Sequence, residues 1–231
     1  MSNKILIILL ICFISCRTDN SKSHKEEEKK IKKSSKSIFF DDHGDTIKPQ
    51  TFYLKNNYKL IIFPSKDSIG KNDILNYKIT SKNFKKTFLL SEDLTQNHIL
   101  YYEGIDFQNY FALHSNGGTK NYYFWLYDKH TGLEVLTDSY FKIQRDFELK
   151  NELILYEDED NDYNLFIYDV NSKAKTSIEI PDELIGKDEC TKYNDFYKSV
   201  YIKRVTKEYY YLGFRSCEPS SIEFKVKKSI K

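Results

Sequence analysis

The chain has 231 residues, of which 30% are charged, 40% hydrophobic and 16% aromatic, and its formal net charge is +2. This length allows one good-sized core or two small ones, and the hydrophobic fraction excludes a wholly disordered protein. A net charge this close to zero argues against a nucleic-acid binder held by bulk charge, and only 8 Gly and 4 Pro exclude collagen-like and low-complexity classes.

Residues 1–15 have the organisation of a signal peptide. Lys4 provides a short positive region, and consecutive apolar residues follow from Ile5 to Ile14. This apolar run is about half as long as a bilayer-spanning helix requires. The segment therefore predicts export and not a membrane span.

The end of this segment, Phe13-Ile14-Ser15-Cys16, resembles the lipobox of bacterial lipoproteins, with Phe13 in the place of the usual Leu. The resemblance implies cleavage before Cys16, a diacylglyceryl group on its sulfur and usually a further acyl chain on its amine. Two or more chains give stable membrane anchoring. Arg17 stands where Asp retains such lipoproteins at the inner membrane, so the outer membrane is expected. The alternative is an ordinary secretory signal with an incidental cysteine.

Residues 16–37 are expected to form a disordered, charged tether. Positions 17–37 contain twelve charged residues and one aliphatic residue, Ile31, which is too little apolar surface to offset the entropy of ordering. Their net charge of +4 leaves residues 38–231 with a net charge of −3. A segment that binds phospholipid or a partner is the alternative to a spacer.

Two cysteines remain after Cys12 leaves with the signal peptide and Cys16 takes the lipid. Cys190 and Cys217 are an even pair in a compartment that permits disulfides. Closing this loop would stabilise the fold by roughly 3.5 kcal/mol in the chain-entropy model. A disulfide between them is therefore expected.

The body of the chain, residues 38–231, is predicted to be all-β with antiparallel hairpins. Runs of β-branched and aromatic residues alternate with turn signals, and no window shows convincing helical periodicity apart from weak stretches near 182–190. The expected strands are Tyr58–Phe63, Asp73–Thr80, Ile99–Tyr102, Phe107–His114, Tyr122–Asp128, Glu148–Tyr156, Leu165–Asp169, Val200–Arg204, Tyr209–Phe214 and Ile222–Val226. Turns are expected at Asn116-Gly117-Gly118 and at Thr131-Gly132, where Gly supplies positive φ.

A weak internal repeat runs through these strands. Residues 125–132 (WLYDKHTG) parallel residues 166–173 (FIYDVNSK), with a more degenerate copy at 75–82 (LNYKITSK). The repeat resembles a β-propeller blade, and its spacing of 40–50 residues is in the range of propeller repeats. The resemblance implies about four blades. An open meander or a β-sandwich would give nearly the same pattern.

Motifs that carry chemistry are sparse. No HExxH, GxSxG, GxxxxGK[ST] or CxxC motif occurs, and two Ser-x-x-Lys matches, at Ser68 and Ser172, are expected in a chain rich in Ser and Lys. The five histidines are scattered. His114 and His130 stand at expected loop margins on adjacent strands and could approach each other, but a surface or loop histidine is the preferred interpretation. We therefore expect no catalytic residues, no metal centre and no cofactor.

An acidic run contains the one weak candidate for a cation site. Asp158, Asp160 and Asp162 alternate as the early oxygen ligands of a Ca²⁺ loop do. Tyr163 stands where such a loop needs Gly, so a solvated hairpin tip is the preferred interpretation. Asp41-Asp42-His43-Gly44-Asp45 is interpreted as a turn at the entry to the domain.

Tyr and Trp can stack on sugar rings, which makes Trp125 and the run Tyr209-Tyr210-Tyr211 candidates for glycan binding.

The leading hypothesis is a lipid-anchored, non-enzymatic envelope protein whose β domain binds another protein as a scaffold or complex subunit. The alternatives are an inhibitor or immunity protein that neutralises a toxin, a glycan or small-molecule binder, and a hydrolase with unrecognised residues.

Overall fold

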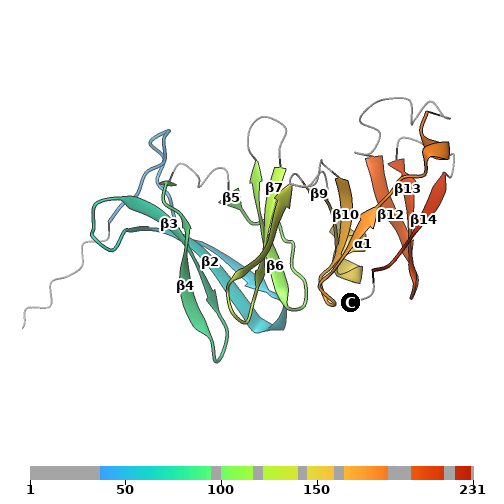
Figure 1. Ribbon diagram of the computed structural model, residues 1–231. Coiled ribbons are helices and arrows are strands. Elements are labelled where there is room, and N and C mark those ends of the chain that lie inside the picture. Colours follow the sequence, from blue (N-terminus) through green and yellow to red (C-terminus); the bar gives the residue numbers. More distant parts are fainter. Residues whose placement is uncertain are drawn as a thin grey trace, which may run out of the picture. The chain divides into compact units, whose positions relative to one another are not determined.

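Antiparallel β-strands make up most of the regular structure in the computed structural model (Figure 1). The structure describes residues 37–94, 100–116, 122–139, 145–158, 164–186, 199–215 and 222–229. The strands are β1 (Gln50–Leu54), β2 (Tyr58–Lys66), β3 (Asp73–Thr80), β4 (Lys85–Ser91), β5 (Leu100–Tyr101), β6 (Tyr110–Asn116), β7 (Tyr122–Asp128), β8 (Glu134–Ser139), β9 (Leu153–Asp158), β10 (Asn164–Asp169), β11 (Ala174–Ile178), β12 (Val200–Val205), β13 (Tyr209–Phe214) and β14 (Glu223–Lys227). One α-helix, α1 (Arg145–Asn151), and short 3-10 helices at Lys55–Asn57 and Asp182–Leu184 complete the elements named here.

The strands pair almost entirely with their neighbours in sequence. The hydrogen-bonded orders are β1-β2-β3-β4, then β5 to β11 in succession, then β12-β13-β14. Among the described residues, only the pair Ser139 and Glu157 joins β8 to β9. The chain thus forms four small sheets, which we call sheet 1 (β1–β4), sheet 2 (β5–β8), sheet 3 (β9–β11) and sheet 4 (β12–β14). The predicted all-β class with antiparallel hairpins is confirmed, and none of the sheets closes on itself.

Hydrophobic residues bind each sheet to the next one along the chain. One cluster joins Leu60 and Ile79 of sheet 1 to Phe111 and Leu113 of sheet 2. A second cluster joins the opposite face of sheet 2 to sheet 3, and a third joins the other face of sheet 3 to sheet 4. Sheets 2 and 3 are therefore covered on both faces, which explains the continuous hydrophobic runs in β7 and β9.

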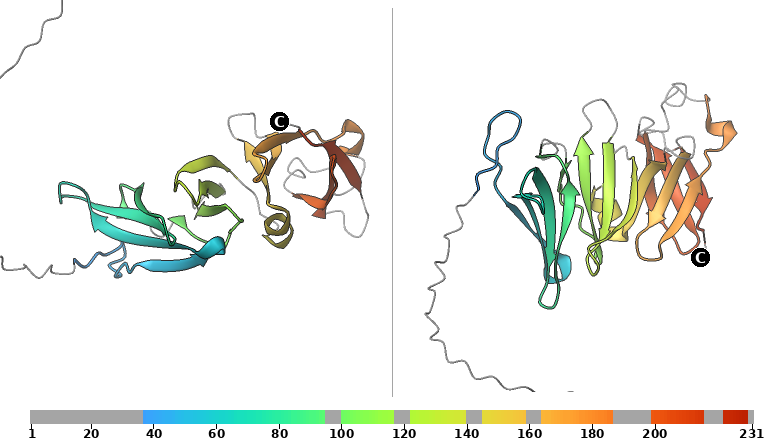
Figure 2. Two further views of the ribbon diagram at one scale, coloured as in Figure 1. Left: turned by 90° about the horizontal axis from the view of Figure 1, so that it is seen from below. Right: turned by 60° about the vertical axis from the view of Figure 1, so that its left-hand side comes forward.

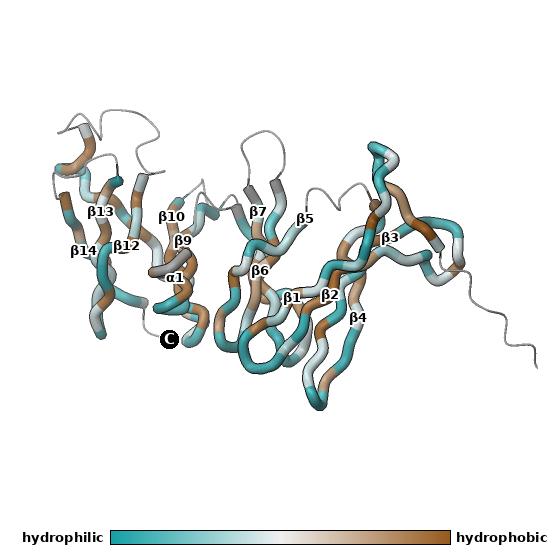
Figure 3. The backbone as a smooth tube through the Cα atoms, turned by 180° about the vertical axis from the view of Figure 1, so that it is seen from behind, coloured by the Kyte–Doolittle hydropathy of each residue, from teal (hydrophilic) through white to brown (hydrophobic). Residues whose placement is uncertain are grey.

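Strand β9 shows this double burial most clearly, because all six of its residues are buried. In β2, by contrast, fully buried residues alternate with partly exposed ones. Figure 3 shows the hydrophobic segments within the strands and hydrophilic residues at many of the turns. A period-2 pattern therefore marks a strand such as β2, and a continuous pattern marks a strand such as β9 that is covered on both faces.

The prediction of a strand over Glu148–Tyr156 is wrong in its first half. Residues Arg145–Asn151 form α1, which lies beside β9 (Figure 2), and the strand begins only at Leu153. The carboxylate of Glu148 is buried and accepts the backbone N–H of Leu155 at 3.2 Å. This contact between the helix and the strand stabilises a local structure that strand propensity alone does not predict.

Two turns have the same hydrogen-bond pattern. Asp128 Oδ1 accepts the backbone N–H groups of His130 and Thr131, and Asp169 Oδ1 accepts those of Asn171 and Ser172. Gly132 closes the first turn with φ +73°, so the predicted left-handed glycine is confirmed. The predicted Gly117-Gly118 turn lies outside the described residues.

Contacts divide the chain into residues 1–36 and a unit of residues 37–231. The predicted signal peptide and nearly all of the predicted tether lie in the first part, which the structure does not describe. Within the described ranges, no helix is long and apolar enough to cross a bilayer.

Candidate binding pocket

A pocket of about 340 Å³ opens between sheets 1 and 2. Its walls contain four aromatic side chains: Tyr77 from β3, Phe88 from β4, and Trp125 and Tyr127 from β7. The rings of Tyr77 and Phe88 stack with their centroids 5.1 Å apart, and those of Tyr77 and Tyr127 lie 5.0 Å apart. The volume is at the small end of the range for ligand sites, and the walls are apolar as such sites usually are.

The polar groups of the pocket gather at its β7–β8 side. The hydroxyl of Tyr77 donates a 2.6 Å hydrogen bond to the carbonyl oxygen of Gly132. Glu134 lines the pocket, and its carboxylate accepts a hydrogen bond from the Thr137 hydroxyl. Burial raises the pKa of both Tyr77 and Tyr127, and the negative charge of Glu134 raises each pKa further. Both phenols therefore stay protonated at neutral pH, and Glu134 is the one acidic side chain among the described residues of the pocket wall.

Gly132 allows sheet 1 to approach this turn closely. A Cβ atom at Gly132 would lie 2.2 Å from Cε2 of Phe88, which is far inside van der Waals contact. The same residue has a positive φ of +73°. The positive φ favours glycine, although Lys173 adopts a φ of +57° in the second turn, and the close approach of Phe88 leaves no room for a side chain.

Exposed hydrophobic side chains lie in the pocket wall and next to it in sequence. Leu89 is 51% exposed, Leu133 is 58% exposed, and Val135, next to Glu134 on β8, is 38% exposed. Leu89 and Leu133 are themselves pocket-lining residues. An apolar rim beside an aromatic pocket is typical of a surface that binds another molecule.

A fully buried lysine, Lys129, lies in the same β7–β8 turn, three residues before Gly132. Lys129 Nζ is 2.5 Å from Asp106 Oδ1 and donates to the carbonyl oxygen of Phe107 at 2.6 Å. Asp106 Oδ2 also accepts the backbone N–H of Lys55, 2.6 Å away. Burial lowers the pKa of Lys129, and the hydrogen bond and charge of Asp106 oppose that shift.

Gln108 extends this polar network to sheet 3. Its side chain and backbone carbonyl both bond to the side chain of Asn56, at 2.9 Å each, and its backbone N–H donates to Glu152 Oε1 at 2.5 Å. The network joins the turns of three successive sheets. Each group named here serves the fold, so we assign Lys129 a structural role.

The predicted Ca²⁺ residues fall mostly outside the described ranges. Asp160 and Asp162 lie outside them, whereas Asp158 ends β9 and is 4% exposed. Its carboxylate is paired with Lys175, whose Nζ lies 3.9 Å from the centroid of the Phe166 ring. Asp158 is therefore already held by a cation of the chain itself.

The predicted lipidation and disulfide residues, Cys16, Cys190 and Cys217, also lie outside the described residues, and both assignments stay predictions. Ser68 and Ser172, which begin the Ser-x-x-Lys matches, are in turns and not on helices. In the 41–45 segment, Asp41 Oδ1 accepts the backbone N–H groups of His43 and Asp45, which makes it a turn as interpreted.

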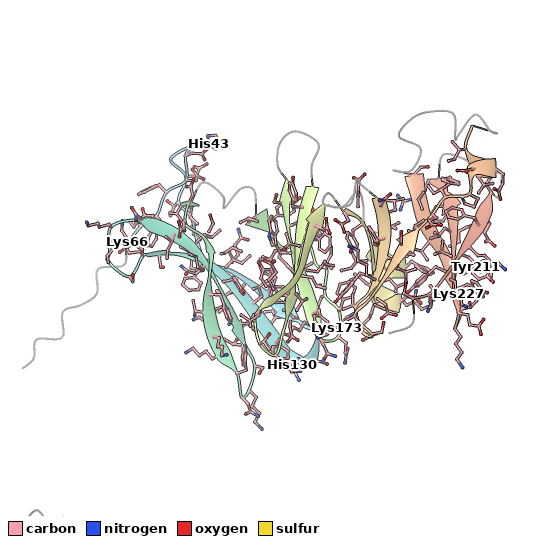
Figure 4. All side chains as sticks on the ribbon, viewed as in Figure 1. His43, Lys66, His130, Lys173, Tyr211 and Lys227 are labelled. Atoms are coloured by element: carbon pink, nitrogen blue, oxygen red, sulfur yellow. The ribbon has the colours of Figure 1, made fainter. Side chains whose placement is uncertain are left out.

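His114 and His130, which the sequence places on adjacent strands, lie apart. His114 is fully buried on β6, whereas the side chain of His130 is 59% exposed at the β7–β8 turn (Figure 4). The β6 residue opposite that turn is Tyr110, four positions before His114, or about 13 Å along the strand. The interpretation as a surface or loop histidine is therefore confirmed for His130 and wrong for His114.

The glycan candidates have different surroundings. Tyr210 is buried, and the rings of Tyr209 and Tyr211 carry cations, with Lys225 Nζ at 4.9 Å and the Arg204 guanidinium at 3.2 Å from their centroids. One face of each exposed tyrosine is thus already occupied by a side chain of sheet 4. Trp125 instead lines the pocket.

Scans against protein-family models, curated proteins and solved structures found no match for this chain. The pocket geometry and the sequence therefore carry the functional argument.

Proposed function

We propose that this chain is a lipid-anchored protein of the cell envelope whose β domain has no catalytic role and binds another protein through the pocket between sheets 1 and 2. The observation that carries the proposal is the aromatic pocket with its rim of exposed Leu89, Leu133 and Val135. Interfaces bury central aromatic anchors within an apolar surface. The lipid on Cys16 would hold the domain at the membrane, and we infer the outer membrane from Arg17.

The surroundings of the buried polar groups also support the proposal. Lys129 and Asp106, the ion pair with the most deeply buried cation among the described pairs, are held by backbone groups of adjoining turns. The pocket contains one carboxylate and aromatic hydroxyls with raised pKa values, which lack the paired acid and base of a hydrolytic site. A contact surface suits this arrangement better than a reaction site.

Site-specific photocrosslinking in intact cells tests the proposal. A photoreactive amino acid replaces Leu133 at the pocket rim, and the matched control replaces Ile185, an apolar residue that is 47% exposed and remote in sequence. We expect a crosslink to one protein from Leu133 and none from Ile185. The same crosslink is expected to be weaker in the Cys16→Ala form, because that variant is no longer concentrated at the membrane.

Each alternative gives another result. Equal labelling from both positions, or none from Leu133, would reject this pocket as the protein-binding site. A crosslink to polysaccharide would support the glycan-binding alternative, in which Trp125 is the stacking residue. A toxin as the crosslinked protein would identify the inhibitor or immunity alternative.

A further inference from the structure

We propose that the pocket between sheets 1 and 2 receives the ammonium group of a lysine side chain of the partner, held between the aromatic rings and the carboxylate of Glu134. This inference rests on the proposed function and names the chemistry that the pocket recognises. Its first basis is the pocket wall. Tyr77, Phe88, Trp125 and Tyr127 line one cavity. Tyr77 packs against both Phe88 and Tyr127, so a cation would be attracted by the quadrupoles of the ring surfaces that still face the cavity.

The second basis is the position of the charge. Glu134 lines the same cavity, and its charge acts on both the Tyr77 and Tyr127 hydroxyls. The Thr137 hydroxyl donates to the Glu134 carboxylate and fixes one of its oxygens. Within the described part of the chain, no lysine or arginine lies over the rings of Phe88 or Trp125. A carboxylate beside aromatic faces is the arrangement that a bound ammonium group completes.

The third basis is a filled example of the same arrangement inside this chain. In sheet 3, Lys175 Nζ lies 3.9 Å from the centroid of Phe166 and 5.5 Å from that of Tyr156, and it pairs with the Asp158 carboxylate. Rings, carboxylate and lysine are all present there. The pocket between sheets 1 and 2 has the rings and the carboxylate, and the proposed partner supplies the lysine.

The size and charge of the surroundings agree with this occupant. The cavity of about 340 Å³ is large enough for a four-carbon ammonium chain and small for an extended ligand. Residues 38–231 carry a net charge of −3, which favours a basic partner surface. The exposed Leu133 and Val135 would contact the apolar stem of the lysine and its neighbours.

Trp125 provides a direct assay because it is the single tryptophan of the chain. The full-length protein is titrated with n-butylammonium, with its neutral analogue n-pentanol and with the anion butanoate, and Trp125 emission is followed. We expect a saturable change with n-butylammonium at concentrations at least tenfold below those needed for n-pentanol. Equal responses to the cation and to the neutral analogue would overturn the inference.

Variants show where the ammonium group binds, and further ligands show which kind of molecule supplies it. E134Q is expected to weaken n-butylammonium binding about tenfold, whereas the matched surface variant E179Q leaves it unchanged. Equal binding by E134Q would reject the role of this carboxylate, with equal urea midpoints showing that the variants are folded. Binding of choline without binding of Nα-acetyl-lysine amide would indicate a lipid headgroup and overturn the lysine assignment.

The protein-binding proposal and the lysine-binding proposal can be rejected independently of each other. A crosslink from Leu133 without ammonium binding keeps the protein-binding surface and rejects the lysine. Ammonium binding without a protein crosslink from Leu133 keeps the cation site and rejects protein binding at the rim.

Discussion

Replacing Gly132 by alanine tests whether the close contact between sheets 1 and 2 is as tight as the structure indicates. Two terms add in this variant. Positive φ costs an alanine roughly 1–2 kcal/mol, and the new Cβ would lie 2.2 Å from the Phe88 ring, an overpacking that typically costs roughly 1–3 kcal/mol. The expected loss of stability is therefore about 2–5 kcal/mol.

Gly44 is the matched control for the backbone term. It has a φ of +84°, and a Cβ atom there would meet nothing within 4 Å. Gly44→Ala should therefore cost only about 1–2 kcal/mol, the strain of the left-handed conformation. The difference between the two variants isolates the contact with Phe88.

Urea unfolding followed by Trp125 emission measures both variants, since this single tryptophan lines the pocket that the substitution disturbs. A double variant, Gly132→Ala with Phe88→Leu, removes the ring atoms nearest the new Cβ and should lose less stability than the two single variants together. Equal midpoints for Gly132→Ala and Gly44→Ala would refute the close approach of Phe88. Additive effects in the double variant would refute the clash as the cause.

Three further predictions concern the interior, the pH dependence and the anchor. Lys129→Met should destabilise the fold by about 3–5 kcal/mol because it leaves the Asp106 carboxylate without its buried cation, and adding Asp106→Asn should recover part of this loss in urea unfolding. Burial raises the pKa of Tyr210 to about 12, above its ordinary value near 10, so stability should be unchanged below pH 10 and fall as pH rises towards 12. Tyr210→Phe should remove up to about 1.4 kcal/mol per pH unit of that fall, and an unaltered alkaline profile would contradict it. Cys16→Ala should move the protein from the membrane fraction to the soluble fraction, and a variant that stays with membranes would refute the lipid anchor.

The strands that the sequence predicts well are those whose side chains are mostly buried. The predicted limits of Asp73–Thr80, Tyr122–Asp128 and Tyr209–Phe214 agree with β3, β7 and β13. Each of these strands lies between two neighbouring strands of its sheet, so apolar and aromatic residues are frequent in its sequence. For such central strands, the residue composition of the segment is enough to predict a strand.

The missed strands β1, β4, β8 and β11 have a different position. β1, β4 and β11 lie at sheet edges, and β8 meets its outer neighbour through one residue pair. An edge strand such as β11, AKTSI, buries only alternate residues and carries polar groups between them. Its hydrogen-bonding partner decides its conformation, and a single sequence does not show that partner.

The pocket could not be predicted for the same reason. Phe88 and Glu134 belong to the missed strands β4 and β8, and the sequence separates them by 46 positions. Trp125 was recognised as a candidate from its residue type. Its companions were not, because face-to-face packing of sheets 1 and 2 is what brings them together. Lys129 carried no signal either, since a lysine in a turn is normally solvated.

The packing of each sheet onto the next one also predicts which strands unfold locally most often. Each hydrophobic cluster joins two sheets that are consecutive in the chain, so we expect stability to behave as a sum of couplings between neighbouring sheets. Amide exchange should then be fastest in β1 and β14 and slowest in β7 and β9, where both faces of the strand are covered.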